Sequence, residues 1–297
     1  MHKWPTSALL ALVLLLPNCS LRTLAVNQIG NAIAGGGSTF SSDDDPELVG
    51  DALPFSLKLI EGLLAESPRQ TALLVAASRG FTQYAYGWVE PANDPSATDR
   101  RLRAKRLYLR ARDYGLRSLT VSIDRFPARL AADPHAAVAL ARKRDVPALY
   151  WTAASWGLAI SLSKDDPDLL ADLPAVDAMI ARAAELDPEF ENGAIDTFLI
   201  TYEASRSGMS RDAGSRAREH FRRAVERSHG NSAAPYVAAA EALAIPAQDR
   251  AEFDSLLENA LAVDLNAEPL WRLQNILSRR RAEWLRTHAD DYFFGGE

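Results

Sequence analysis

Apolar side chains recur along most of the chain at the spacing of helices that face a core. In one stretch, Leu102, Leu109, Leu116 and Ile123 lie seven residues apart, and basic residues fill most of the opposite positions. An apolar stripe at this spacing is typical of an amphipathic helix. Residues 172–186 carry a second such stripe, whereas no region combines alternating β-branched residues with hairpin turns. The pattern therefore predicts an all-α fold.

A degenerate repeat runs through the helical part of the sequence. Each copy has a small or apolar residue four positions before a Ser or Asp, and a residue suited to a chain turn follows closely. The four copies place Leu63, Ala183, Ala224 and Ala260 at that position, and the last three lie 41 and 36 residues apart. This interval is close to the period of tetratricopeptide repeats, in which paired helices pack through small residues. We therefore expect an array of antiparallel, tetratricopeptide-like helix pairs.

The start of the chain has the three-part layout of a secretory signal peptide. A short basic lead that contains Lys3 is followed by a compact apolar run over residues 8–16, and Pro17 then breaks this run. Cys19, the single cysteine of the chain, comes directly afterwards in the sequence LPNC. A cysteine at this point is typical of bacterial lipoproteins, in which the thiol is lipidated and becomes the mature N-terminus. We predict a signal peptide over residues 1–18 and a lipid anchor on Cys19.

The residues after the cysteine predict where the folded domain begins. Ser20, rather than an aspartate, follows the cysteine, which in a bacterium with two membranes favours sorting to the outer membrane. Residues 19–42 form the expected anchor and linker, with room for a short helix over residues 21–34. Three aspartates then precede Pro46, an arrangement typical of a helix N-terminus. We expect a single α-helical domain over residues 43–297.

Composition and charge narrow the class of protein. The chain has 33 Lys and Arg against 39 Asp and Glu, a formal net charge of −6, so we exclude a nucleic-acid binder. Its hydrophobic fraction of 47% and charged fraction of 24% are typical of a folded, water-soluble protein. Past residue 20, no apolar stretch reaches the length of a membrane span. We therefore expect a periplasmic protein that contacts the membrane only through its N-terminal anchor.

Motifs of catalysis or metal binding are sparse. The five histidines are scattered without ligand spacing, and with one cysteine we expect no metal site. Ser161 and Lys164 fit the SxxK pattern of penicillin-interacting serine enzymes, but the companion SDN and KTG motifs are missing. A solvated helix end is the favoured interpretation of these two residues. We expect neither an enzyme nor a cofactor, and nominate no catalytic residue.

Two segments are rich in aromatic residues. The first contains Tyr84 and Trp88, and the second contains Tyr150, Trp151 and Trp156. On a helix Trp151 and Trp156 point about 140° apart, so their helix is apolar on two sides. It is either a central helix buried on both sides or a helix with one side on a ligand passage. These five residues are the candidates for lining a ligand path or pore.

Several long segments of the sequence resemble the T-component of TRAP transporters, the TatT family. The resemblance runs in order from about Asp43 to Phe294 and covers nearly all of the predicted mature chain. The segments that carry it are DDDPELVGDALPFSLKLIEGLLAESP, YWTAASWGLAISLSKDDPDL, ELDPEFENGAIDTFLITYEASR, AREHFRRAVERSHG with the residues that follow it, and NILSRRRAEWLRTHADDYFF.

The resemblance implies a periplasmic lipoprotein that docks the solute receptor of an ion-driven uptake system. Members of the family are thought to form homotrimers around a pore for a small, hydrophobic ligand. We therefore expect a non-enzymatic accessory component of this kind. In the last resembling segment, Arg279, Arg280 and Arg281 are the candidate docking patch for an acidic partner, with a solvated helix face as the alternative.

Two other functions stay open at the level of the sequence. The first is an envelope scaffold whose tetratricopeptide-like helices bind a protein partner without any ligand pore. The second is an envelope enzyme that uses Ser161 and Lys164.

Overall fold

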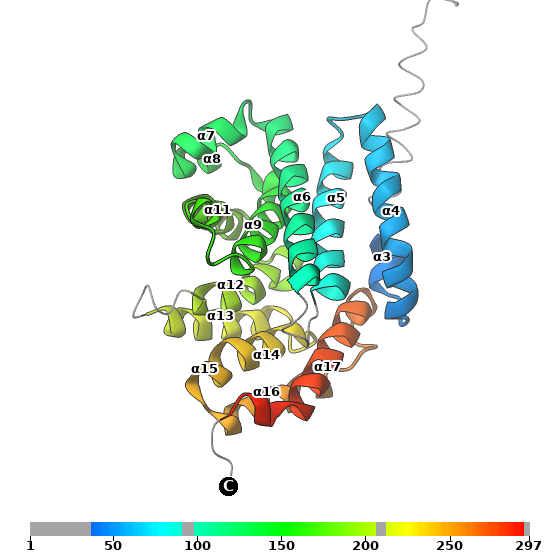
Figure 1. Ribbon diagram of the computed structural model, residues 1–297, viewed down its shortest axis with the longest axis vertical. Helices are drawn as coiled ribbons and strands as arrows, with labels where there is room; N and C mark the ends of the chain where they lie inside the picture. The colour runs from blue at the N-terminus through cyan, green and yellow to red at the C-terminus, as the bar shows by residue number, and fades with distance from the viewer. Residues whose placement is uncertain (1–36, 91–97, 206–211, 294–297) are drawn as a thin grey trace, which may run out of the picture.

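The fold is all-α, as the sequence predicts. The computed structural model describes residues 37–90, 98–205 and 212–293, and within these ranges every regular element is a helix. Figure 1 shows one group of helices side by side in the N-terminal half and a second group below them in the C-terminal half. The predicted lipidation site Cys19 and the predicted helix over residues 21–34 lie outside the described residues.

Five long helices of the N-terminal half pack in chain order. They are α4 (Pro46–Glu66), α5 (Thr71–Tyr84), α6 (Thr98–Ser122), α9 (Val146–Ser161) and α11 (Leu173–Leu186). Within this group α6 contacts both α5 and α9, and α9 also contacts α11 (Figure 1). Of the 16 residues of α9, 13 are buried. It is therefore a central helix buried on both sides, which is the first of the two interpretations of its sequence.

The last long helix of the C-terminal half packs against the first helices of the N-terminal half. Its helices are α12 (Ala194–Ala204), α13 (Ala213–Arg227), α14 (Ala234–Ala239), α16 (Arg250–Ala262) and α17 (Arg272–Thr287). In Figure 1, α17 returns to the side of α4 and α3 (Gly37–Ser41), and it contacts both. The Arg272 guanidinium donates a hydrogen bond of 3.3 Å to the carbonyl oxygen of Ser42. The two ends of the described chain are thus joined.

Short elements connect these helices. Those of the N-terminal half are α7 (Phe126–Ala132), α8 (Pro134–Ala139), η3 (Lys143–Asp145), α10 (Pro167–Leu170) and η4 (Phe190–Asn192). Those of the C-terminal half are α15 (Ile245–Ala247), η6 (Pro269–Trp271) and η7 (Ala289–Asp291).

The buried face of α6 differs from the one predicted. Leu102 is 48% exposed, and the buried seam consists mainly of small residues at alternating spacings of three and four. These residues are Ala104, Tyr108, Ala111, Gly115 and Ser118. A Cβ on Gly115 would overlap the hydroxyl of Thr152 in α9. Because α6 is packed between α5 and α9, close approach of the helix axes favours small residues on the seam. Of the predicted stripe, Leu119 and Ile123 are buried and Leu109 and Leu116 pack against the core, whereas Leu102 does not.

Three copies of the predicted repeat end a helix in the same way. The residue after α4, α11 and α13 donates its backbone N–H to the small or apolar residue four positions earlier, at 2.9 to 3.0 Å. The acceptors are the carbonyl oxygens of Leu63, Ala183 and Ala224. Ala224 is fully buried, and its carbonyl lies beside Gly193, whose positive φ of 98° begins α12. Helix pairs are therefore present, while a regular tetratricopeptide superhelix stays a prediction.

Two local predictions about helix ends are confirmed. Asp45 caps α4 because its carboxylate accepts a hydrogen bond of 3.0 Å from the backbone N–H of Leu48, and Pro46 occupies the first turn. Ser161 is the last residue of α9, and its hydroxyl donates to the Leu158 carbonyl at 2.7 Å. Ser161 therefore has the environment of a helix end.

Candidate functional site

Two π-helical segments approach one another where the halves of the chain meet. η2 (Ala85–Val89) continues α5, and η5 (Ala240–Ala244) continues α14. Short π-segments within helices occur frequently at functional sites. Although the two segments are far apart in sequence, the charge of Glu241 in η5 acts on the hydroxyl of Tyr86 in η2. We therefore take this meeting point as the candidate functional site.

Five polar side chains gather there and are called the junction cluster. They are Tyr86, Glu90, Tyr108, Glu241 and Arg281. The Tyr86 side chain is 62% exposed. Nevertheless burial raises the pKa of its hydroxyl, and the negative charges of Glu241 and Glu90 raise it further. The Tyr86 ring is therefore open to solvent, while its hydroxyl is influenced by carboxylates of both halves of the chain.

Glu90 connects η2 to the centre of α6. Its backbone N–H donates to the carbonyl of Ala85 at 2.7 Å, which closes the π-turn. Its carboxylate accepts a hydrogen bond from the hydroxyl of Tyr108, a fully buried side chain. Burial raises the pKa of Glu90 and also that of Tyr108, on which the Glu90 charge acts in the same direction. The orientation of Glu90 is thus fixed by two elements.

Glu241 and Arg281 form the opposite side of the cluster. The Arg281 guanidinium on α17 donates to the Glu241 carboxylate on η5 at 2.9 Å. The same guanidinium lies over the ring of Trp284, 4.5 Å from its centre. A Cβ on Gly87 of η2 would lie 3.5 Å from Leu277 of α17, which is an ordinary van der Waals contact, so η2 and α17 are neighbours. The cluster therefore combines charged pairs with aromatic faces.

Two of the predicted lining residues adjoin this cluster. The rings of Tyr150 and Trp151 on α9 meet edge to face with centroids 4.9 Å apart, and each is 7% exposed. Arg79 of α5 covers Trp151 at 5.5 Å and pairs with Glu191 at 3.5 Å. Burial raises the pKa of Tyr150, and Tyr86 contributes to this rise. These aromatic rings therefore lie beneath an ion pair close to Tyr86.

Tyr84 and Trp88 lie on the other side of η2. Their rings stack with centroids 6.4 Å apart, and the Trp88 indole N–H donates to the carbonyl of Pro46 at 2.9 Å. The Arg103 guanidinium covers Tyr84 at 5.7 Å. A Cβ on Gly50 of α4 would overlap the Trp88 indole. This pair of aromatic residues thus fastens η2 to α4 and α6.

Trp156 lies apart from the other four predicted lining residues. Its indole N–H donates to the Asp172 carboxylate at 3.1 Å, and Arg112 covers its ring at 4.9 Å. It borders a small hollow of about 90 Å³ beside Leu130 and Ala175. The five predicted residues are therefore distributed over three places and only Tyr150 and Trp151 adjoin the junction cluster on its α9 side.

The three predicted docking arginines on α17 have different surroundings. Arg280 pairs with Glu47 of α4, and Arg281 pairs with Glu241 within the junction cluster. Arg279 is half-buried. Docking through these residues stays a prediction, while two of them clearly link helices of the same chain.

Sequence reasoning missed the residues that define the junction cluster. Tyr86 lies within the first aromatic segment, between Tyr84 and Trp88, whereas the aromatic pattern does not point to Glu90 or Glu241. Glu241 is a lone charge in the otherwise uncharged segment YVAAAEALAIP, and this isolation is the signal that could have identified it. Glu90 follows directly on the aromatic run and had no comparable signal.

The described ranges contain neither a cluster of metal-ligating side chains nor a helix that could cross a membrane. There, His, Cys, Asp and Glu side chains do not form a group of three or more that could hold a metal ion. Among the same residues, none of the helices combines the length and apolarity that a membrane span requires.

Comparison with known proteins places the chain in a family. A family model described as "TRAP transporter T-component" matches residues 42–293. The chain is also 28% identical over 305 residues to an uncharacterized protein of Treponema pallidum (strain Nichols), with 94% of each chain covered. The match over 42–293 spans both halves and every element that contributes to the junction cluster. The chain therefore belongs to the family of TRAP transporter T-components.

Proposed function

We propose that the protein is a non-enzymatic, lipid-anchored accessory component of a TRAP-type uptake system on the periplasmic side of the membrane. It docks the periplasmic solute receptor and offers a small hydrophobic ligand a path past the junction cluster. The observation that carries this proposal is the family match over residues 42–293. TRAP T-components are a family of transport components and not of enzymes.

The contact point for the ligand is the exposed ring of Tyr86. Its accessibility supports this role, as does the ring of Trp284, which lies under Arg281 of the junction cluster. An apolar ligand with one polar group suits this lining, because ligand sites combine apolar surface with a few placed polar groups.

The homotrimer is supported by the outer face of α4. Leu48, Phe55 and Leu59 lie on this face and are 59%, 74% and 43% exposed. Their spacings of seven and four place them on one stripe of the helix. Large apolar side chains gathered on one exposed face mark interaction surfaces. We assign this stripe to the contact between copies of the chain.

The anchor is Cys19, which we place in the outer membrane because Ser20 follows it. The described chain starts at α3, which packs against α17 and η6. Seventeen residues lie between Cys19 and Gly37, and such a length can span at most roughly 60 Å. Replacement of Cys19 by Ala is expected to release the protein into the soluble periplasmic fraction, and membrane retention of that variant would contradict the anchor.

Native mass spectrometry of the chain from Ser20 onward tests the other parts of the proposal together. The protein is purified without detergent and measured with and without the TRAP solute receptor that is encoded nearest to it. A trimer that binds the receptor and carries an apolar small molecule is expected. Loss of the small molecule, but not of the trimer, in the Tyr86→Ala variant would connect the ligand to the junction cluster.

The scaffold alternative makes a different prediction in the same experiment. If the chain binds the receptor but neither it nor the complex carries a small molecule, the helices act as a protein-binding scaffold and the ligand path is wrong. The exposed stripe on α4 is the observation that favours this alternative, because it requires only a protein partner.

A further inference from the structure

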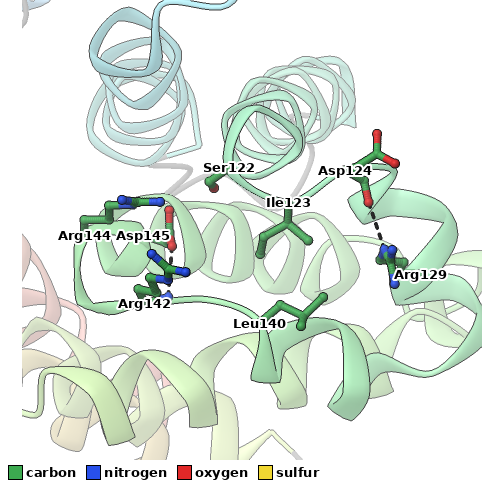
Figure 2. A pocket seen from close by; sticks show the side chains of 8 residues that line it. All are labelled: Ser122, Ile123, Asp124, Arg129, Leu140, Arg142, Arg144 and Asp145. Carbon is green, nitrogen blue, oxygen red and sulfur yellow. Dashed lines mark hydrogen bonds between the residues drawn. The ribbon is translucent and has the colours of Figure 1, made fainter.

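A basic hollow of about 270 Å³ lies at the end of α6, away from the junction cluster. It is bordered by α7 and α8 and by the turn that leads into α9. Ile123 and Leu140 line its centre, and Leu140 is 51% exposed. Figure 2 shows Arg142 and Arg144 on one side of these apolar residues and Arg129 with Asp124 on the other. The hollow thus has an apolar middle and guanidinium groups on both sides.

Among the described residues, the two aspartates of the hollow form no ion pair with its three arginines. Asp145 is 7% exposed, and its carboxylate accepts a hydrogen bond of 2.9 Å from the backbone N–H of Arg142. Arg129 donates its Nε–H to the backbone carbonyl of Asp124 at 2.9 Å. The Asp124 carboxylate, 84% exposed, instead faces Arg125 at 3.4 Å.

The arginines of the hollow therefore keep their charge for another molecule. Within the described ranges, no ion pair involves the side chain of Arg129, Arg142 or Arg144, whereas most arginines of α13 and α17 are paired with a carboxylate. This excess of positive charge occurs on a chain whose formal net charge is −6. The hollow is thus locally opposite in sign to the protein as a whole.

The positions of two of these arginines are fixed by the backbone. Arg142 precedes the single turn η3 and has an extended backbone, which directs the turn away from α8. Because Asp145 ties the Arg142 amide into this turn and α9 follows directly, Arg142 and Arg144 project from a rigid segment. The rigid backbone fixes where these two exposed side chains begin, and each guanidinium can donate two hydrogen bonds to a carboxylate.

We propose that this hollow receives an acidic segment of the TRAP solute receptor, with a carboxylate on Arg142 and Arg144 and a neighbouring apolar side chain on Leu140. The apolar middle favours a peptide segment over a small inorganic anion, which would leave Leu140 without a contact. The inference rests on the proposed function, because it takes the receptor as the partner. It places the docking contact at the end of α6 and not on the arginines of α17.

The test is the affinity of the lipid-free chain from Ser20 onward for the receptor, measured by biolayer interferometry at low and at moderate salt. The double variant Arg142→Glu and Arg144→Glu is expected to bind at least tenfold more weakly than the wild type, and its affinity should lose most of its salt dependence. Leu140→Asp should weaken binding by a similar factor. Both substitutions alter exposed side chains, and circular dichroism checks that the variants are folded.

The matched control is the double variant Arg106→Glu and Lys164→Glu, which changes the net charge equally at exposed positions, in the N-terminal half of α6 and beyond the C-terminal end of α9, away from the hollow. It should bind within twofold of the wild type. If both double variants bind alike, the hollow is not the docking site, and this inference is wrong while the proposed function stands. If the wild type does not bind the receptor at all, docking in the proposed function fails and this inference fails with it.

Discussion

The indole N–H of Trp88 donates a hydrogen bond of 2.9 Å to the carbonyl oxygen of Pro46, 42 residues earlier in the chain. This bond fastens the π-helix η2 to the first turn of α4. Gly50 lies one turn further along α4, and its missing side chain leaves the space that the indole fills. The position of the junction cluster therefore depends on a contact between a tryptophan and a glycine.

Gly50→Ala is expected to lower the free energy of unfolding by about 1–3 kcal/mol, because the added methyl group overlaps the Trp88 indole. Gly62→Ala, in the same helix, is the control. No atom lies within 4 Å of a Cβ at Gly62, so this change should raise the free energy of unfolding by about 0.5–1 kcal/mol. Urea unfolding of both variants measures the difference. Equal effects in the two variants would contradict the packing of Trp88 against α4.

Trp151→Ala and Tyr86→Ala should separate core aromatic residues from a ligand contact. Trp151 is 7% exposed and is covered by Arg79, so its loss should cost about 3–5 kcal/mol of stability. Tyr86 is 62% exposed, and its loss should cost at most about 1 kcal/mol. Tyr86→Ala should nevertheless weaken the binding of an apolar dye such as Nile red, measured by fluorescence. Unchanged dye binding in this variant would argue against Tyr86 as the ligand contact.

Glu90 should make the protein less stable as the pH rises. Burial raises the pKa of Glu90 above its ordinary value, so between those two values the folded protein binds a proton that the unfolded chain has released. The free energy of unfolding therefore falls as the pH increases through this window. Glu90→Gln removes the charge and keeps an oxygen that can accept the Tyr108 hydrogen bond. The variant should be more stable than the wild type at pH 8, and this advantage should vanish towards pH 4.

For Glu47, the free energy of unfolding is expected to change with pH in the opposite direction, and Glu47→Gln serves as the comparison. The hydrogen bond from Arg280 lowers the pKa of Glu47, so this carboxylate contributes stability above its ordinary pKa that is lost as the pH falls. Thermal melts between pH 4 and pH 8 distinguish the two cases. If Glu47→Gln also gained stability at pH 8, the effect at Glu90 could not be attributed to burial.

Asp196→Ala is expected to lower the free energy of unfolding by about 1–3 kcal/mol, because it removes a buried carboxylate that is hydrogen-bonded to charged and polar partners. The Asp196 side chain is 4% exposed, and it lies 3.4 Å from Arg223 and in contact with Arg227. Burial lowers the pKa of the neighbouring His220 to about 4, so this ring is neutral at pH 7 and the two arginines are the charged partners.

Glu219→Ala is the matched change at the surface of the same helix, α13. Glu219 pairs with Arg222 and also lies 3.7 Å from Arg223, and each of these three side chains is at least 40% exposed. Loss of such an exposed pair should change stability by less than about 1 kcal/mol. Chemical denaturation of the two variants tests the contrast. Similar losses in both would mean that Asp196 contributes no more than a surface charge.

Much of the fold could be predicted because its signals are local. The cap at Asp45, the helix end at Ser161 and the apolar stripe of α11 depend on residues within one or two turns of each other. The buried face of α6 could not be predicted in the same way. There, contact with two helices at once selects Ala111 and Gly115 over the leucines, and this contact is invisible in the periodicity of a single helix.

The candidate site was only partly predictable for a related reason. Tyr150 and Trp151 were identified by their aromatic density, but the same signal also selected Trp156, which lies elsewhere with Arg112 and Asp172. Arginines of α6 cover Phe81, Tyr84, Tyr114 and Trp156, so part of the aromatic excess serves contacts between helices. Glu241 joins Tyr86 only when α14 is folded against the other half of the chain.

The π-turn in η2 has a consequence for how relatives of this chain should be aligned. A π-turn holds one residue more than an α-turn, so η2 adds one residue to the turn that continues α5. Deleting one residue from 85–89 would restore an α-helical turn at the end of α5. Trp88 and Glu90 would then no longer face Pro46 and Tyr108 together. A relative with a one-residue gap at this point is therefore expected to lack the junction cluster even where its aromatic residues are retained.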